Sequence, residues 1–229
     1  METRERMTTT SKSAQRPRDP LTRDRVLEGA VALADERGIS ALTMRNLAGV
    51  LDRKPMALYH HVANKDEVLD GMVDAVFGEI DLPDDSVGWK TAMRQRAGSA
   101  RTVLLRHPWA LGLMDARTAP GVATLRHLDA VIGCLLDGGF SIEMAGHAVS
   151  LIDAYVYGFV LQEVSLPFDT PEETHDAADA VVEQAGDEFP HLAAMAARYV
   201  LQPEYNFEDE FHFGLDLILD GLEQMVAAG

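Results

Sequence analysis

The N-terminal fold is decided by residues 42–65, which read LTMRNLAGVLDRKPMALYHHVANK. Thr43 can cap a first short helix, because its hydroxyl can accept a hydrogen bond from a backbone N–H that has no partner within the helix. Leu47, Ala48 and Leu51 then follow at the three- and four-residue spacings that place side chains on one apolar face. The segment therefore begins with a short amphipathic helix.

A second helix of about two turns is expected after a turn at Asp52. Lys54 and Pro55 begin it, and proline suits the first helical position because its missing N–H would have had no partner there. Leu58 and Val62 can anchor this helix inward. Two short helices joined by a tight turn are typical of the helix-turn-helix, whose second helix presents its N-terminal residues to the major groove of DNA.

Two longer helices are expected to complete this module. Thr22 can cap a helix over residues 23–37, and Gly38 can end it in a left-handed conformation. Asn64 can cap a helix over residues 65–80, which would link the DNA-binding part to the rest of the chain. Any three-helix packing unit shows similar periodicity, but the order of residues favours a DNA-binding module.

The residues expected to contact DNA lie on the outward side of the second helix and around it. Arg45 and Tyr59 are expected to touch base edges or phosphates, because arginine pairs well with guanine edges. Lys54, His61 and Lys65 are expected to pair with phosphates. The predicted DNA-binding set is Thr43, Met44, Arg45, Lys54, Pro55, Met56, Ala57, Tyr59, His60, His61 and Lys65.

This order of residues resembles the tetracycline-repressor (TetR) family of bacterial transcription regulators. The most specific pieces are GISALTMRNLA at 38–48, ALYHHV at 57–62 and NKDEVL at 64–69. The resemblance implies a homodimer with an N-terminal DNA-binding domain and a larger all-helical domain that binds a small molecule. A weaker similarity, over residues 139–163, extends to the effector-binding domain of the tetracycline repressors themselves.

The chain departs from the family pattern at three positions. Asp52 stands where the turn often carries glycine, although aspartate visits left-handed conformations more readily than most other residues. Lys54 replaces a small capping residue such as serine and instead places a cation where a phosphate would lie. Gln162 occupies the place of a glutamate that helps to bind the magnesium–drug complex, and the histidine of that site has no convincing match. The resemblance therefore predicts neither a metal site nor tetracycline as the effector.

The charge distribution favours a DNA partner despite the net charge of −17. Residues 1–65 hold 12 Lys and Arg against 8 Asp and Glu, a charge of +4, whereas residues 66–229 hold 8 against 29, a charge of −21. A cationic head on an acidic body places the attractive field at one end of the molecule. For the body alone, an ordinary acidic surface that confers solubility is an equally good interpretation.

Composition sets the remaining bounds. The hydrophobic fraction of 47% is ample for a packed core, and no apolar stretch approaches the ~20 residues that span a membrane. The one cysteine, Cys134, fits a small core residue in a reducing cytoplasm. Residues 1–20 are interpreted as a disordered arm, whose Arg16 and Arg18 belong to a solvated tail or reach a minor groove.

The remaining chain, residues 68–229, is expected to form an all-α domain for effector binding and dimerisation, after a DNA-binding domain at 21–67. Its periodicity predicts helices at 89–106, 120–138, 141–165, 170 onward, within 187–202, and 206–227. The helices at 141–165 and 206–227 carry apolar residues on more than one face. The family resemblance indicates that this pair forms a four-helix bundle between two chains; the alternative is that both fill a monomeric core.

The predicted effector site is a largely apolar pocket. Methionine fills irregular space, and tyrosine and glutamine supply hydrogen bonds, so a small and largely apolar effector is expected. Core packing alone also explains most of these positions, and the pair Glu143 and His147 is better interpreted as an exposed ion pair than as metal ligands. The predicted ligand-binding set is Trp109, Met114, Phe140, Met144, His147, Tyr155, Phe159 and Gln162.

These patterns predict a ligand-responsive repressor released from a palindromic operator. A transcriptional activator and a ligand-independent regulator are the alternatives. An enzyme is disfavoured, because the chain has no G-x-S-x-G elbow, glycine-rich phosphate loop, cysteine pair or H-E-x-x-H motif. No catalytic residue and no cofactor is therefore predicted.

Overall fold

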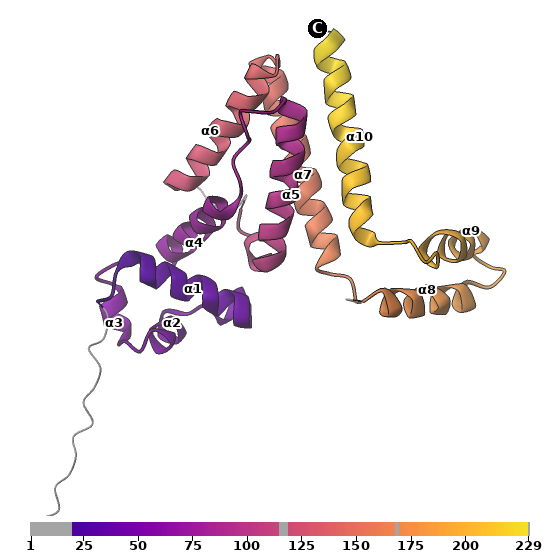
Figure 1. Ribbon diagram of the computed structural model, residues 1–229. Helices are drawn as coiled ribbons and strands as arrows, with labels where there is room; N and C mark the ends of the chain where they lie inside the picture. Colours follow the sequence, from indigo (N-terminus) through magenta and orange to yellow (C-terminus); the bar gives the residue numbers. More distant parts are fainter. Residues whose placement is uncertain (1–19, 115–118, 168–169, 229) are drawn as a thin grey trace, which may run out of the picture.

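The computed structural model describes residues 20–114, 119–167 and 170–228, and within these ranges the chain is helical and has no strand, as expected for an all-α protein (Figure 1). The expected N-terminal arm lies outside the described residues. The α-helices are α1 (Arg23–Arg37), α2 (Met44–Val50), α3 (Pro55–Leu58), α4 (Lys65–Glu79), α5 (Trp89–Arg106), α6 (Val122–Asp137), α7 (Ile142–Glu163), α8 (Pro171–Ala185), α9 (Pro190–Met195) and α10 (Phe207–Ala228). Shorter helical segments are η1 (Ile39–Ala41), η2 (Pro108–Ala110) and the π-helical η3 (Ala196–Val200).

The helices α1 to α3 and the start of α4 form a small N-terminal domain, here called the head. Side-chain caps fix its helix starts: the Thr22 hydroxyl accepts from the Arg25 N–H at 3.2 Å, and the Thr43 hydroxyl accepts from the Asn46 N–H at 3.1 Å. Its core buries Leu47, Leu58 and their apolar neighbours completely. Both predicted caps and the bounds of α1 are confirmed.

The turn between α2 and α3 has the predicted backbone. Asp52 has a φ of 50° and is the one non-glycine residue with positive φ among the described residues. Gly38 ends α1 with a positive φ of 77°, but its ψ of 160° is extended and not left-handed helical. Glycine tolerates this conformation because it has no Cβ.

The second helix is shorter than predicted. α3 comprises four residues, because the His61 N–H bonds to the Leu58 carbonyl at 2.9 Å and tightens the chain into a turn. This turn returns Val62 to the core and leaves Asn64 extended, so that its side chain accepts from the Glu67 N–H at 2.8 Å. Lys65 consequently begins α4 and does not lie on the second helix.

α4 links the head to the body, which comprises the helices from α5 onward. It packs against α1 on one side and α6 on the other. Gly71 allows the close approach to α1, since a Cβ there would lie 2.6 Å from a methyl carbon of Leu27. Val68, Met72 and Val76 of α4 are fully buried, as predicted.

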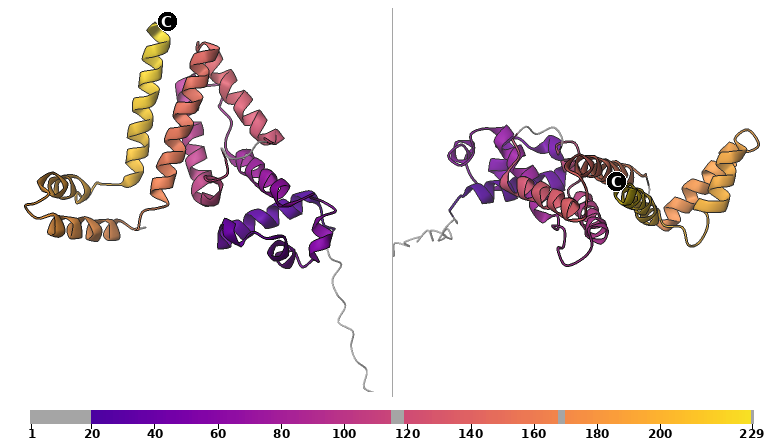
Figure 2. Two further views of the ribbon diagram at one scale, coloured as in Figure 1. Left: turned by 180° about the vertical axis from the view of Figure 1, so that it is seen from behind. Right: turned by 90° about the horizontal axis from the view of Figure 1, so that it is seen from above.

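The central body consists of α5, α6, α7 and α10, which pack side by side (Figures 1 and 2). α5 has the predicted bounds, while α6 begins at Val122, two residues after the expected start. The Ser141 hydroxyl caps α7 by accepting from the Met144 N–H at 3.2 Å. Leu151 of α7 and Met225 of α10 are exposed, so each of these helices has a side that no other part of the described chain covers.

The length and composition of α7 are sufficient for a membrane span, contrary to the expectation that no such stretch exists. The buried core helix of a globular protein passes the same test. Ala148, Ile152 and Val156 of α7 are buried against other helices of this chain.

The helices α8, α9 and η3 form a hairpin, here called the arm, that projects sideways from the ends of α7 and α10 (Figures 1 and 2). The Thr170 hydroxyl accepts from the Glu173 N–H, and the Glu173 carboxylate accepts from the Thr170 N–H, which is the capping box typical of a helix start. The predicted short helix within residues 187–202 divides into α9 and η3.

Candidate nucleic-acid interface and effector cavity

The outer surface of the head exposes apolar side chains that contribute little to its core. Met56 on α3 is 71% exposed, and Tyr59, directly after α3, is 44% exposed. Pro55 starts α3. The leading turn of this short helix is exposed, as are Lys54 before it and His60 after it. An exposed methionine and tyrosine beside cations are suited to contacts with bases and the thymine methyl group.

Three cations around α3 form no ion pair within the described part of the chain. Arg45 on α2, Lys54 before α3 and Lys65 at the start of α4 are all exposed. Free cations at the surface are available to neutralise phosphates, which is the main source of affinity for DNA. Arg45 and Lys54 belong to the helix-turn-helix, and Lys65 begins the helix that follows it.

Some predicted DNA-binding residues have structural roles as well. Thr43 caps α2, and Met44 is half-buried against the core of the head. Ala57 and His61 are also half-buried, whereas His60 is exposed. Most of the predicted DNA-binding residues are therefore exposed, whereas Met44, Ala57 and His61 are partly covered.

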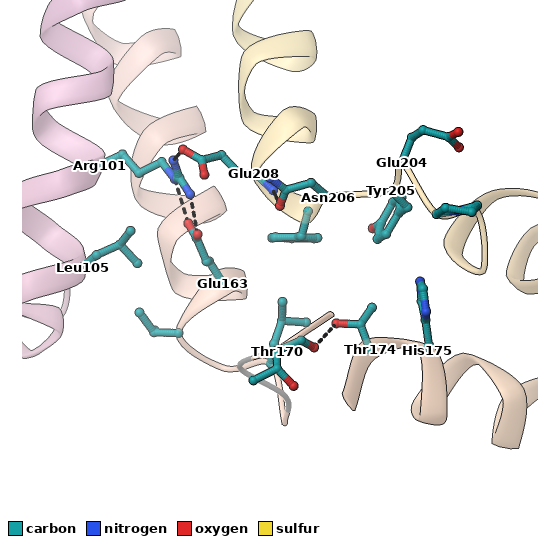
Figure 3. Close-up of a pocket in the computed structure, with 14 residues that line it drawn as sticks. Arg101, Leu105, Glu163, Thr170, Thr174, His175, Glu204, Tyr205, Asn206 and Glu208 are labelled. Carbon is teal, nitrogen blue, oxygen red and sulfur yellow. Dashed lines mark hydrogen bonds and ion pairs between the residues drawn. The ribbon is translucent and has the colours of Figure 1, made fainter. Parts of the chain in front are cut away.

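A cavity of about 610 Å³ lies where the arm joins the central body (Figure 3). Its walls come from the C-terminal halves of α5 and α7, the start of α8, the segment before α10 and the first turn of α10. Ligand pockets are typically about 300–1,000 Å³. The lining residues are Arg101, Leu105, Glu163, Val164, Leu166, Thr170, Thr174, His175, Pro203, Glu204, Tyr205, Asn206, Phe207 and Glu208.

Arg101 holds one wall of this cavity together (Figure 3). Its Nε and Nη2 donate to the Glu163 carboxylate at 2.9 and 2.5 Å, and its Nη1 donates to the Glu208 carboxylate at 2.7 Å. The Arg101 side chain is only 10% exposed. The hydrogen bond with Glu163 is the main reason why the pKa of Arg101 is raised, and the hydrogen bond from Arg101 lowers the pKa of Glu208. Arg101 therefore joins α5 to α7 and α10.

None of the eight predicted ligand-binding residues lines this cavity. His147 is 70% exposed as a side chain and faces Glu143 at 3.9 Å, the exposed pair expected from their spacing. Gln162 is also exposed. The Tyr155 hydroxyl oxygen lies 3.0 Å from each of the carbonyl oxygens of Glu210 and Phe211 and donates a hydrogen bond to them. This contact fixes α7 to α10.

The other predicted ligand residues lie in the core or beside it. Phe140 packs edge-on against Trp89 at a centroid distance of 4.7 Å. Met114 is buried, Met144 is half-buried, and Phe159 stacks on Phe207 at 5.0 Å. Phe159 thus lies directly behind the cavity, because Phe207 is one of its lining residues.

Another buried polar cluster of the body is centred on His127. Arg96 Nε donates to His127 Nε2 at 3.0 Å, and Arg96 Nη1 donates to the Asp153 carboxylate at 2.5 Å. His127 is fully buried, and its Nδ1 has no hydrogen-bond partner among the described residues. Burial, and then the nearby Arg96 charge, lower the pKa of His127 to about 4. His127 is therefore neutral at pH 7.

A polar contact, here called the pin, joins the head to the body. Asp35 of α1 accepts hydrogen bonds from His107 Nδ1 at 2.7 Å and from Trp109 Nε1 at 2.6 Å. His107 Nε2 lies 3.3 Å from the Glu79 carboxylate of α4, which also pairs with Arg106 at 3.0 Å. Trp109, predicted to bind a ligand, therefore contributes to this contact between the domains.

The pin and the Arg101 cluster were missed from the sequence because their partners are far apart in the chain. Asp35 is 72 residues from His107, and Arg101 is 62 residues from Glu163. No local spacing marks such pairs. The sequence feature that could have indicated buried ion pairs is the presence of arginines within otherwise apolar helical patterns of an acidic domain.

No group of three or more potential metal ligands occurs within residues 20–114, 119–167 and 170–228. His212 and Asp216, which are four apart on α10, do not share a site, since Asp216 pairs with Arg94 at 2.6 Å. The half-buried Cys134 is a free thiol whose pKa is raised chiefly by burial.

The architecture and the sequence both match known proteins. Residues 82–226 match the tetracyclin repressor-like C-terminal domain. The HTH-type transcriptional repressor DrrR1 of Streptomyces coeruleorubidus is 32% identical over 219 residues, which cover 92% of this chain and 80% of that protein. The crystal structure of the TetR-family protein ActR of Streptomyces coelicolor with actinorhodin aligns with a TM-score of 0.76 and 28% identity, over 89% of this chain and 96% of that one. BioQ with its double-stranded DNA operator aligns with a TM-score of 0.61 and 25% identity, over 90% of this chain and 99% of that one.

A head with an exposed helix-turn-helix and a helical body with a cavity define a DNA-binding transcriptional regulator that responds to a ligand. The chain belongs to the TetR family, with a C-terminal domain like that of the tetracycline repressors. The expected family and its regulatory, non-enzymatic class are thus confirmed.

Proposed function

We propose that this protein is a cytoplasmic repressor that binds a palindromic operator as a homodimer and is released by a small effector. The observation that carries the proposal is the exposed leading turn of α3, flanked by the exposed cations Arg45, Lys54 and Lys65. The repressor name of DrrR1, the ActR complex with actinorhodin and the BioQ complex with its operator support repression, effector binding and operator binding, respectively.

Dimerisation is supported by apolar side chains that one chain leaves uncovered. Leu151 and Leu161 on α7, and Phe213 and Leu217 on α10, are all exposed, and α7 packs against α10. Burial of such side chains contributes about 1.5–3 kcal/mol each when it is complete. We propose that these two helices meet their copies in a second chain, which would place two heads about 34–36 Å apart for successive major grooves.

The DNA contacts are assigned by chemistry and exposure. Arg45 and Tyr59 contact base edges or phosphates, and Met56 offers an apolar surface to thymine methyl groups. Lys54 and Lys65 pair with phosphates. These two lysines fix the position of the head on the duplex and carry no sequence information themselves.

The first experiment selects bound sites from random double-stranded DNA with the full-length protein. The expected product is a palindrome with half-sites about one helical turn apart, and a reporter gene placed behind it should be repressed. A reporter that is activated would instead favour the alternative of a transcriptional activator. Failure to enrich any sequence would contradict the proposal.

The second experiment substitutes Tyr59→Ala and Tyr59→Phe and titrates the selected operator in a gel shift. We expect the alanine variant to lose affinity about 5- to 150-fold, since a base contact contributes about 1–3 kcal/mol. The phenylalanine variant separates the ring from the hydroxyl. Unchanged affinity of both variants, with unchanged thermal stability, would remove Tyr59 from the DNA interface.

A further inference from the structure

The head contacts the body through two different helices, α4 and α1. On α4, the Asp74 carboxylate accepts hydrogen bonds from the backbone N–H of Thr124 at 2.8 Å and from its hydroxyl at 2.9 Å, in the first turn of α6. On α1, the contact is the pin, in which Asp35 meets His107 and Trp109 at η2. A domain held through one helix can still turn about it, whereas a contact on a second helix opposes that rotation.

The close packing of the head makes it a rigid unit. α1 contacts both α2 and α4, and α2 contacts α3. Val26, Leu47 and Leu58, which come from these first three helices, are fully buried in a common core, and Gly71 brings α4 close to α1. Because such interiors deform little, the angle between α1 and the body sets the direction of the exposed leading turn of α3.

The geometry of the pin restricts this angle. A single oxygen of Asp35 accepts hydrogen bonds from two different side chains, His107 and Trp109, and both of these side chains are buried. The other ring nitrogen of His107 lies 3.3 Å from the Glu79 carboxylate of α4. Hydrogen bonds weaken steeply when they bend, so two donors that converge on one oxygen allow little rotation of α1.

Asp35 does not belong to the core of the head. Its side chain is 31% exposed, whereas its neighbours Leu33 and Ala34 are buried in that core. Charge-assisted hydrogen bonds are directional, but those of a part-exposed carboxylate contribute only modestly to stability. Loss of the pin should therefore free the orientation of the head without unfolding it.

The orientation of the heads matters because a dimer must meet two half-sites at once. Successive major grooves lie about 34–36 Å apart, one turn of about 10–10.5 base pairs. One added or removed base pair therefore shifts a half-site by about 3.4 Å along the DNA axis and rotates it by roughly 35° about that axis. A head that can turn can follow this change, whereas a head held through both helices cannot.

We infer that Asp35 is a positioning residue for operator recognition. By holding His107 and Trp109, it fixes the orientation of the head on the body, and in a dimer it thereby determines which half-site spacing the protein accepts. Asp35 acts through the angle of α1 and not by touching DNA. The inference rests on the proposed function, since a spacing preference requires a dimer on a palindromic operator.

The test compares three operators that differ only in half-site spacing. One has the spacing that the full-length protein selects from random DNA, and the other two have one base pair added or removed at the centre. Gel-shift titrations give the dissociation constant of each operator for the wild type and for Asp35→Ala, Asp35→Asn and Glu36→Ala. Glu36→Ala is the matched control, because it removes an exposed carboxylate from the same turn of α1 that does not belong to the pin.

The wild type should bind the selected spacing at least about tenfold more tightly than either altered operator, since linked binding modules lose their mutual reinforcement when geometry prevents both from engaging. Asp35→Ala should reduce this preference to about threefold or less. Asp35→Asn should retain most of it, because the amide oxygen can accept both hydrogen bonds, and Glu36→Ala should retain all of it. An undiminished preference in Asp35→Ala, or an equal reduction in its control, would overturn the inference.

Trp109→Phe is a second variant that leaves the carboxylate in place. It removes one of the two donors to Asp35 and keeps an aromatic ring, so its spacing preference should lie between those of Asp35→Ala and Glu36→Ala. Circular dichroism and thermal melting establish that each variant is folded. If Asp35→Ala does not fold, Trp109→Phe decides, and a preference equal to that of the wild type would then contradict the inference.

A measurement without DNA shows whether the pin opens. In a Trp89→Phe background, Trp109 is the one remaining tryptophan of the chain, and it is 8% exposed. Asp35→Ala should raise the acrylamide quenching constant of its fluorescence by about twofold or more, because local opening exposes the ring, and Glu36→Ala should leave it unchanged. Unchanged quenching in Asp35→Ala would show that Asp35 does not hold Trp109, which would overturn the inference.

Failure of this inference is distinguishable from failure of the proposed function. If no operator is enriched from random DNA, the repressor is contradicted, and the role of Asp35 in spacing is contradicted with it. If an operator is bound and its spacing preference survives Asp35→Ala, the repressor is upheld and only the role of Asp35 is contradicted.

Discussion

The head and the body of this protein use their cations in opposite ways. In the head, Arg45, Lys54 and Lys65 are exposed and form no ion pair within the described residues. In the body, Arg96 and Arg101 are buried and bonded to carboxylates on other helices. Cationic residues are therefore left at the surface at one end of the molecule and stabilise internal structure at the other.

This difference has a physical basis in the distribution of acids. Residues 66–229 hold 29 of the 37 Asp and Glu residues, so the few cations of the body find partners across helix interfaces. An arginine buried between helices is costly unless carboxylates and hydrogen bonds compensate for its desolvation. Residues 1–65 have a charge of +4, and the exposed cations around α3 remain available to a polyanion.

The largest expected effect comes from removing a buried cation of the body. Arg96→Ala would leave Asp153 and His127 without their shared donor, and breaking a buried pair in this way costs about 3–5 kcal/mol. Urea unfolding would measure the change in free energy of unfolding. A matched substitution in the head, Lys54→Ala, should change stability by less than about 0.5 kcal/mol. Equal effects of the two substitutions would remove the contrast between the regions.

A second prediction concerns the pH dependence of the body. The folded-state pKa of His127 is about 4, below the ordinary value of 6.5, because the ring is buried. The unfolded chain therefore takes up a proton that the folded chain does not, and stability is lost as the pH falls from about 6.5 to 4. The loss attributable to His127 is roughly 3 kcal/mol at pH 4.

His127→Gln isolates this contribution, because glutamine can still accept from Arg96 and does not titrate. The difference in free energy of unfolding between wild type and variant should change by roughly 3 kcal/mol between pH 7 and pH 4, in favour of the variant at low pH. Chemical unfolding at several pH values measures it. A pH-independent difference would show that the His127 environment does not oppose protonation.

The smallest expected effect lies in the turn of the head. Glycine tolerates a φ of 50° better than any other residue, so Asp52→Gly should relieve backbone strain at this turn. Glycine also increases the conformational entropy of the unfolded chain, which opposes this gain. The free energy of unfolding should therefore change by less than about 1 kcal/mol. Asp52→Val should destabilise the head by about 1–2 kcal/mol, because a β-branched residue is strained there. Thermal melting compares the two, and an equal cost would indicate that backbone strain is unimportant at this turn.

The structural features predicted correctly from the sequence are those that depend on residues close together in the chain. The caps at Thr22, Thr43 and Asn64 were predicted because a capping side chain acts within three residues of its own position. The predicted length of α3 was wrong, because Leu58 and Val62 can be buried in the same core whether the residues between them form a helix or a turn.

The cavity could not be predicted for a different reason. Hydrophobic periodicity identifies residues that face other helices, and Phe140 and Met114 are such residues, but they pack tightly and leave no space. The cavity forms where the arm leaves the central body, and its walls come from the ends of helices and from connecting segments. Its position depends on the direction in which the arm projects, which no local pattern encodes.

The salt dependence of operator binding tests the central claim most directly, namely that the free cations of the head bind DNA phosphates. For the Arg45→Ala/Lys54→Ala/Lys65→Ala variant, the slope of log K against log salt should become shallower by two to three units, about one for each phosphate that the protein no longer neutralises. The control Arg126→Ala/Arg198→Ala, which removes exposed cations of the body, should leave the slope unchanged. A triple variant with the slope of the wild type, or a control whose slope falls by as much, would contradict the account.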